Sequence, residues 1–193
     1  YKAVAVTLLQ DFKAEDLAKL VKHSDTKMLL VGPFVWRELQ HQELPALEAI
    51  ISMDDFSFIH LDESHKGRVE HIMQEESALT ENTFFSLVKG GTIDLDSLAL
   101  INYTSGSTGS PKGVMICHEN ICNQAQNPKS TYDSLLCITT ISFDVSVDDI
   151  LTSLSNGLKL ILADDIQIKN VPELIKLIDV NKPEVLEITP SRL

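Results

Sequence analysis

Short apolar runs alternate with amphipathic stretches over most of the chain. Runs rich in Val, Ile and Leu are typical of buried strands, and apolar residues three or four positions apart are typical of helices. The predicted strands are residues 3–8, 27–31, 47–53, 98–103, 114–116, 134–140, 159–163 and 185–189. The predicted helices are residues 12–23, 33–40, 118–125, 147–155 and 172–180. Residues 54–96 lack a clear pattern, and we expect a surface connection there with one or two short helices.

This alternation predicts the fold class and a division of the chain. Strands that alternate with helices are typical of α/β proteins, so we expect strand–helix units that form mostly parallel sheets. The run Asn-Pro-Lys-Ser at residues 127–130 has the composition of a linker. We therefore predict a first α/β subdomain at residues 1–127 and the start of a second α/β subdomain at residues 128–193.

Composition excludes several classes of function. The 193 residues carry 16 Lys and Arg against 28 Asp and Glu, without a basic cluster, so nucleic acid is excluded as a partner. No apolar run approaches the roughly 20 residues of a membrane span. Cys117, Cys122 and Cys137 cannot all pair, and we expect three reduced, buried thiols in a cytoplasmic protein. The start at Tyr1 indicates a piece of a longer protein.

The segment from Tyr103 to Met115 combines glycines, hydroxyl side chains and one lysine, directly after a predicted strand. Glycine lets the backbone bring N–H groups close to an anion, hydroxyls add further donors, and Lys112 adds a positive charge. The glycine spacing matches neither the P-loop of NTPases nor the Gly-x-Gly-x-x-Gly of dinucleotide-binding folds. The segment therefore predicts a phosphate-binding loop of another kind.

This loop resembles the Ser/Thr/Gly-rich signature of the adenylate-forming superfamily, which includes acyl-CoA synthetases, luciferases and the adenylation domains of nonribosomal peptide synthetases. In that superfamily the loop closes over the β- and γ-phosphates of ATP. The resemblance implies ATP binding by Ser105, Gly106, Ser107, Thr108, Gly109 and Lys112. It further implies a catalytic role for Thr108 and Lys112. His118, in the segment after the loop, is interpreted as a helix-start residue without chemistry.

A second segment, residues 141–150, links a predicted strand to a predicted helix. Helix capping explains part of it, because Ser146 can cap the helix with Asp149 as the acid of a capping box. Asp148 also favours the positive N-terminus of a helix. Capping does not explain Asp144, which lies two residues earlier among apolar neighbours and therefore needs a partner.

The sequence Phe-Asp-x-Ser-Val in this segment resembles the motif of amino-acid-activating adenylation domains, in which the aspartate accepts the α-ammonium group of the substrate. The resemblance assigns substrate binding to Phe143, Asp144, Val145 and Asp148. We expect Asp144 and Asp148 on opposite sides of the helix start. Asp148 has two interpretations: a helix cap, or a pocket carboxylate that favours substrates with an ammonium, guanidinium or hydroxyl side chain.

The resemblance extends over the whole chain, but it covers only the middle of the superfamily's large N-terminal domain. The second half is closest to peptide synthetase adenylation domains, whereas Asp11, Phe12 and residues 44–48 are more similar to acyl-CoA synthetases. The superfamily's later motifs, which contact adenine and ribose and supply a C-terminal lysine, have no match in this sequence. We therefore expect the isolated chain to be inactive.

For the parent enzyme, the resemblance implies an ATP-dependent ligase that converts a carboxylic acid, in the first interpretation an amino acid, into an acyl adenylate and passes it to a thiol. Its cofactors would be ATP and Mg²⁺, and the thiol would belong to coenzyme A or to phosphopantetheine on a carrier protein. No residue of this sequence is assigned to metal binding. Two alternatives stay open: an acyl-CoA ligase for a fatty or aryl acid, and a noncatalytic fragment that binds a nucleotide or a partner.

Overall fold

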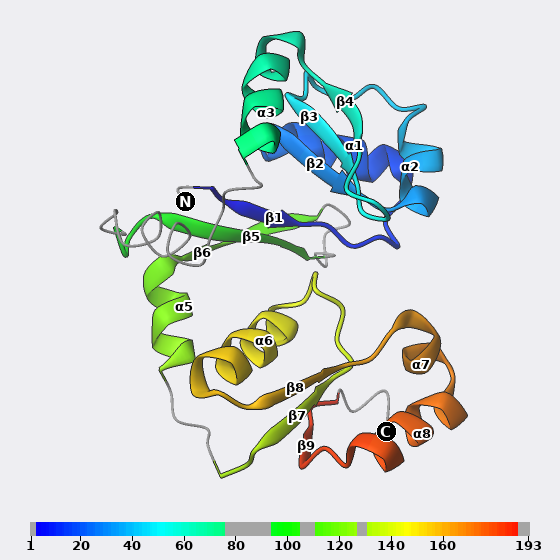
Figure 1. The fold of residues 1–193 in the computed structure, drawn as a ribbon, viewed down its shortest axis with the longest axis vertical. Coiled ribbons are helices and arrows are strands. Elements are labelled where there is room, and N and C mark those ends of the chain that lie inside the picture. Colours follow the sequence, from blue (N-terminus) through cyan, green and yellow to red (C-terminus); the bar gives the residue numbers. More distant parts are fainter. Residues whose placement is uncertain (1–2, 76–93, 105–110, 127–130, 189–193) are drawn as a thin grey trace. The chain divides into compact units, whose positions relative to one another are not determined.

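Strands and helices alternate through the structure, a computed structural model that describes residues 3–75, 94–104, 111–126 and 131–188 (Figure 1). The strands are β1 (Ala5–Thr7), β2 (Met28–Val31), β3 (Ala49–Ser52), β4 (Phe58–Leu61), β5 (Leu98–Thr104), β6 (Lys112–Cys117), β7 (Ser134–Cys137), β8 (Lys159–Leu162) and β9 (Val185–Leu186). The helices are α1 (Ala14–His23), α2 (Pro33–Leu39), α3 (Glu63–Glu75), α5 (His118–Ala125), α6 (Asp144–Asn156), α7 (Asp165–Lys169) and α8 (Val171–Asn181). The predicted α/β class is confirmed, and most of the described strand pairs are parallel.

The chain divides into two compact units, one formed by Tyr1 and Leu8–Thr92 and the other by Lys2–Thr7 and Ile93–Leu193. The first unit contains a sheet in the order β2-β3-β4, in which β2 and β3 are parallel and β4 returns antiparallel. The second unit contains two sheets, in the orders β1-β5-β6 and β8-β7-β9. Residues 127–130 lie outside the described residues, and the strands before and after them belong to different sheets. The subdomain boundary at residue 127 stays a prediction.

The core of the first unit is formed by the apolar face of α1 and by residues of β2 and β3. Leu17, Leu20 and Val21 lie on one face of α1 because they are three or four residues apart, and all three are buried. Val21 packs in one cluster with Val31 of β2 and Ile50 of β3. The helical spacing seen in the sequence therefore predicted the buried face of this helix.

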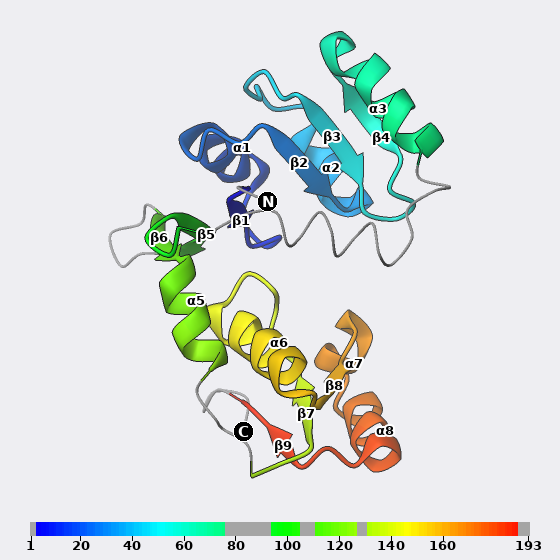
Figure 2. The same ribbon diagram turned by 60° about the vertical axis from the view of Figure 1, so that its left-hand side comes forward.

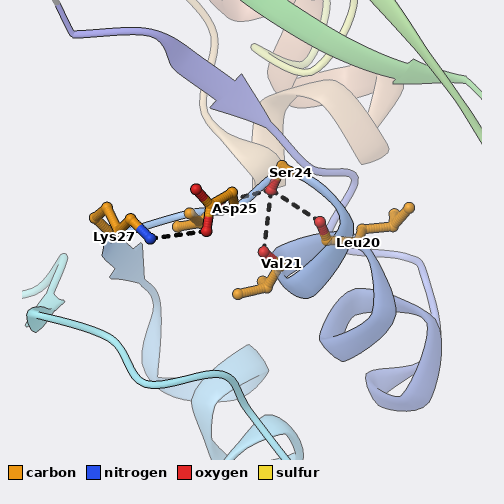
Figure 3. Close-up of polar contacts among 6 residues, drawn as sticks. Leu20, Val21, Ser24, Asp25 and Lys27 are labelled. Atoms are coloured by element: carbon orange, nitrogen blue, oxygen red, sulfur yellow. Dashed lines mark hydrogen bonds and ion pairs between the residues drawn. The ribbon is translucent and has the colours of Figure 1, made fainter.

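Figure 3 shows how α1 ends and the chain turns toward β2. Ser24 Oγ lies 2.8 Å from the carbonyl oxygen of Leu20 and 3.2 Å from that of Val21, in addition to the backbone N–H groups that these two oxygens accept. Asp25 follows with a φ of 51°, and its carboxylate lies 2.7 Å from Lys27 Nζ. The hydrogen bond to Asp25 raises the pKa of Lys27. Local polar contacts thus fix the turn that leads into β2.

Strand β4 lies inside residues 54–96, which were predicted to be a surface connection. It pairs with β3 after a turn in which Phe56 has a φ of 56°. Most of its residues are exposed, so the strand has no alternation of buried and exposed positions from which the sequence could have predicted it. Helix α3, in the same segment, agrees with the prediction of one or two short helices there.

The two sheets of the second unit differ in how their strands are paired. β1 is parallel to β5, whereas β6 returns antiparallel because the connection between Thr104 and Lys112 is too short for a parallel crossover. β8 and β9 both run parallel to β7, and Leu136, Ile138 and Ile161 form the core of this sheet. These parallel pairs confirm the strand–helix alternation that the sequence predicts after residue 130.

Helix α6 lies between β7 and β8 in sequence and packs against α5, the helix that follows β6. It lies beside α5 in Figures 1 and 2, and Ser155 Oγ of α6 lies 3.2 Å from the carbonyl oxygen of Ala125 in α5. Helix α7 was not predicted, although Asp164 caps it: the Asp164 carboxylate accepts the N–H of Gln167 at 2.8 Å. The capping signal was present in the sequence, but the helix has only five residues, too few for a repeating apolar pattern.

The prediction that all three cysteines are buried is wrong for two of them. Cys137 is buried in β7, whereas Cys117 and Cys122 are half-buried. The physical reason is their location, because Cys117 ends the edge strand β6 and Cys122 lies on α5, a helix in which no residue is fully buried. All three thiols are free. Within the part of the chain that the structure describes, no helix is both long and apolar enough to cross a membrane.

Candidate functional site

The hairpin of β5 and β6 holds both ends of the predicted phosphate loop. Its antiparallel pairing continues to the pair Tyr103 and Gly113 and then to the pair Thr104 and Lys112. The chain therefore leaves and re-enters the sheet at directly opposed residues, whose Cα atoms are about 5 Å apart in such pairs. The other predicted ATP-binding residues lie outside the described residues: Ser105, Gly106, Ser107, Thr108 and Gly109.

Lys112 places a positive charge at the described end of this hairpin. Lys112 is exposed at the point where β6 begins, so its ammonium group is available to an anion in solution. Two residues before β5 ends, the hydroxyl of Thr7 in β1 donates to Oδ1 of Asn102, which is buried. This side-chain hydrogen bond joins β5, the strand that leads into the loop, to its parallel neighbour β1.

Helix α6 begins three residues earlier than predicted, and the predicted capping by Ser146 and Asp149 is wrong. The N-cap residue is Phe143, and Asp144 is the first residue of the helix. Ser146 is buried inside the first turn, where its hydroxyl donates to the carbonyl oxygen of Phe143 at 2.7 Å. A serine that bonds back to the preceding turn is a helix-interior residue. Asp149 is buried as well, so neither residue is an exposed cap.

This early start changes the relation between the two candidate substrate carboxylates. Asp144 and Asp148 lie four residues apart in one helix, so they are neighbours on one face and not on opposite sides of the helix start, as was predicted. Asp144 is exposed, and its carboxylate accepts the N–H of Val145 at 2.9 Å. Asp148 is half-buried, and its carboxylate accepts the hydroxyl of the buried Thr152 at 3.0 Å.

The four predicted substrate residues are therefore brought together in the first turns of α6. Phe143 is 51% exposed, so its ring is available for contact, and Val145 is half-buried beside it. Asp144 is not enclosed by apolar residues, contrary to what its sequence neighbours suggested, because the helix places it toward solvent. Sequence reasoning missed Thr152, the residue that holds the Asp148 carboxylate.

The other face of α6 is a buried stripe of small polar side chains. It consists of Ser146, Asp149, Thr152 and Ser153, all at most 2% exposed. Three of these positions, 146, 149 and 153, have helical spacing, and this spacing is the signal that could have predicted the stripe. Small polar residues at such positions favour a solvated face in a sequence-based prediction, whereas here they face the protein interior.

Cys137, at the end of β7, titrates in the environment that this stripe creates. Burial raises the pKa of its thiol to about 11, and the negative charge of Asp149 adds to the rise. The thiol therefore stays protonated at neutral pH and is a poor nucleophile. Among the described residues, no group of three or more His, Cys, Asp or Glu side chains could hold a metal ion.

The fold and the loop-bearing hairpin define the class of protein, and comparison with known families agrees. A profile of the family described as AMP-binding enzyme matches residues 1–193, so the chain belongs to this family. The match covers the hairpin of β5 and β6 as well as the start of α6. It confirms the resemblance on which the site residues were predicted.

The chain spans only a small part of the length of the curated relatives that it matches. The chain is 40% identical to bacitracin synthase 3 of Bacillus licheniformis over 107 residues, which is 53% of this chain and 2% of that protein. It is 36% identical to tyrocidine synthase 3 of Brevibacillus parabrevis over 141 residues, which is 69% of this chain and 2% of that protein. Among solved structures, the luciferase-like enzyme of the mealworm Zophobas morio has a TM-score of 0.70 and 17% identity, covering 98% of this chain and 42% of that one. This last similarity shows a shared fold.

Proposed function

We propose that this chain is part of an enzyme that activates a carboxylic acid with ATP. The acid's carboxylate displaces pyrophosphate from ATP to form an acyl adenylate, and a thiol then takes the acyl group with release of AMP. The observation that carries the proposal is the hairpin that opposes Thr104 and Lys112 across a loop of glycines and hydroxyls. The family match over residues 1–193 supports it.

The loop residues position the nucleotide and neutralise its charge. Lys112 would donate to phosphate oxygens and stabilise the negative charge that develops on the departing pyrophosphate, and the hydroxyl of Thr108 would donate to the same group. The remaining loop residues would hold the β- and γ-phosphates: Ser105, Gly106, Ser107 and Gly109. Mg²⁺ supplies further neutralisation when it is bound, and we assign no residue of this chain to it. The protein's main task is to bring two anions together.

We infer that the acid is an amino acid, which the first turn of α6 would recognise. Asp144 is an exposed carboxylate at this helix start and would accept the substrate's α-ammonium group. Phe143, Val145 and Asp148 would line the same pocket. A relative named dimodular nonribosomal peptide synthase, from Bacillus subtilis, supports an amino acid, because peptides are built from amino acids. In that case the acceptor thiol would be the phosphopantetheine of a carrier protein.

The second candidate is an acyl-CoA ligase for a fatty or aryl acid, with coenzyme A as the acceptor. The names of similarly folded proteins, which include an anthranilate CoA ligase, are consistent with it. In this candidate Asp144 would only favour the N-terminus of α6 and would meet no ammonium group. We propose a cytoplasmic location in either case, which the three free thiols support.

The test is ATP–pyrophosphate exchange by the intact enzyme with a panel of amino acids, their deaminated analogues, fatty acids and aryl acids. We expect exchange that depends on an amino acid and is much weaker with the deaminated analogue of that same acid. Exchange with fatty or aryl acids alone would establish the second candidate. If none of the carboxylic acids in the panel supports pyrophosphate exchange, the proposal of acid activation is wrong.

A further inference from the structure

Gly113 faces an aromatic ring at the end of the β5–β6 hairpin. In the antiparallel ladder Gly113 is directly opposite Tyr103, one pair before the hairpin ends. A Cβ atom added to Gly113 would lie 3.3 Å from Cε1 and 3.4 Å from Cζ of the Tyr103 ring. It would lie 3.1 Å from Cγ2 of Ile101, on the same face of β5. The Tyr103 ring therefore occupies the space that a side chain at position 113 would need.

The Tyr103 ring cannot move away easily. Tyr103 is only 2% exposed, so its ring is enclosed on its other sides by protein. Burial also raises the pKa of its hydroxyl, in agreement with an enclosed position. Because interiors are close-packed, a Cβ at position 113 would displace the strand more readily than the ring. By contrast, Gly67 on α3 has no atom within 4 Å of such a Cβ.

The first residues of β6 are exposed on both faces of the sheet. β6 is the edge strand of its sheet, and Val114 and Met115 are 47% and 73% exposed in the described structure. The strand is therefore located by its pairing with β5 and by the contact between the Tyr103 ring and Gly113. Lys112 is the residue directly before Gly113, so any shift of Gly113 moves the backbone that carries the ammonium group.

We propose that Tyr103 and Gly113 are a positioning pair, in which the Tyr103 ring, by filling the space that a side chain at position 113 would need, fixes where Lys112 enters the ATP site. The inference rests on the proposed function of Lys112 and adds two residues that touch no ligand themselves. A Cβ at position 113 forces a displacement of a few tenths of an ångström. Since a misplacement of about 1 Å can cost roughly a hundredfold in rate, we expect a smaller but measurable loss.

The experiment compares Gly113→Ala with Gly67→Ala in the intact enzyme, each in the presence and absence of Lys112→Ala. We expect Gly113→Ala to lower kcat/KM for ATP about tenfold, whereas Gly67→Ala leaves it unchanged. In the Lys112→Ala background, Gly113→Ala should cost less than about twofold, because the group that it misplaces is already gone. A loss that is equally large in both backgrounds would overturn the proposal, since Gly113 would then act independently of Lys112.

The ring is tested by two variants of Tyr103. Tyr103→Phe keeps the ring and should keep kcat/KM for ATP within about twofold of the unmodified enzyme. Tyr103→Leu removes the ring, so Gly113→Ala added to it should cost less than it does beside the intact tyrosine. If Gly113→Ala costs the same with leucine as with tyrosine, the contact with the ring does not position the strand and the proposal is wrong.

A separate measurement keeps this inference distinct from the proposed function. Amide hydrogen exchange in β5 and β6 of the intact enzyme reports the hairpin without any acid or nucleotide. Gly113→Ala should accelerate amide exchange in β5 and β6 and leave exchange in α3 unchanged. Gly67→Ala should not accelerate exchange in β5 and β6. Unchanged exchange in Gly113→Ala would overturn the positioning pair. If the unmodified enzyme activates no acid, the proposed function fails while the exchange result still decides the inference.

Discussion

In the β5–β6 hairpin, the pairing of two strands determines where the residues predicted to bind ATP lie. At α6, the residue at which the helix begins determines where the residues predicted to bind the acid lie. The hairpin carries its lysine on an edge strand, held by the opposed pairs up to Thr104 and Lys112. Helix α6 carries Asp144 and Asp148 on one face and a buried polar stripe on another. A short motif is thus sufficient to predict which residues at the hairpin would bind ATP. At α6, the helix start has to be known before roles can be predicted for Asp144 and Asp148.

The largest effect that would sharpen this contrast is expected for Asp144→Ala in the intact enzyme. If Asp144 pairs with an α-ammonium group that the rest of the pocket encloses, the variant should lose about 3 to 5 kcal/mol of transition-state binding for amino acids. The measurement is kcat/KM in pyrophosphate exchange. Deaminated analogues should lose far less. Asp165→Ala, at the exposed start of α7, is the matched control and should have no effect.

The next effect concerns the hairpin. Lys112→Ala and Thr108→Ala should each lower the adenylation rate by about one to three decades, because both side chains would contact phosphate charge that develops in the reaction. The melting temperature of Lys112→Ala should hardly change, since Lys112 is exposed and exposed residues seldom contribute more than about 0.5 kcal/mol to stability. Lys169→Ala, a lysine in the last turn of α7, is the control. A large drop in melting temperature with a normal rate would make the loop a structural element.

Sequence patterns predicted the hairpin better than the helix, for a physical reason. The spacing of glycines and hydroxyls around Lys112 is a local property, and the strands on both sides of it were predicted from their apolar residues. The start of α6 depends on a competition. Ser146 could have capped the helix, but burial of its side chain and its bond to the carbonyl oxygen of Phe143 favour a start at Asp144.

In the rest of the fold, too, the elements with a local sequence pattern were predicted and those defined by tertiary contacts were missed. Elements with a regular apolar pattern, such as α1 and the parallel strands β7 and β8, were predicted within a few residues. Strand β4 was missed because it lies at a sheet edge with its side chains exposed, so tertiary pairing and not burial defines it. Thr152 was missed although the predicted helix at residues 147–155 contains it together with Asp148, and their spacing of four residues was the signal that could have predicted the contact.

A smaller effect tests whether Asp148 belongs to the pocket. Thr152→Val removes the hydroxyl that holds the Asp148 carboxylate, a hydrogen bond to a charged group that contributes about 1.5 kcal/mol. If Asp148 selects the substrate, this variant should reduce the preference for Lys, Arg, ornithine, Ser or Thr over Leu and Phe by roughly tenfold. Asp148→Asn should reduce it further. If Leu or Phe is preferred and neither substitution changes the ranking, Asp148 has no pocket role.

The smallest effect concerns the buried stripe beneath α6 and appears as a dependence of stability on pH. Burial raises the pKa of the Cys137 thiol from 9.0 to about 11, so between these values the folded chain keeps a proton that the unfolded chain releases. The contribution of this thiol to stability is therefore complete below about pH 9 and is lost as the pH rises toward 11. At pH 10 the loss should be about 1 kcal/mol.

Denaturant unfolding of the chain and of Cys137→Ala at pH 7 and at pH 10 measures this contribution. Other groups titrate over the same range, but they titrate in both proteins, so the difference between the two pH-dependent changes isolates Cys137. The unmodified chain should lose more stability than the variant. Equal losses would mean that the Cys137 thiol is not enclosed beside Asp149.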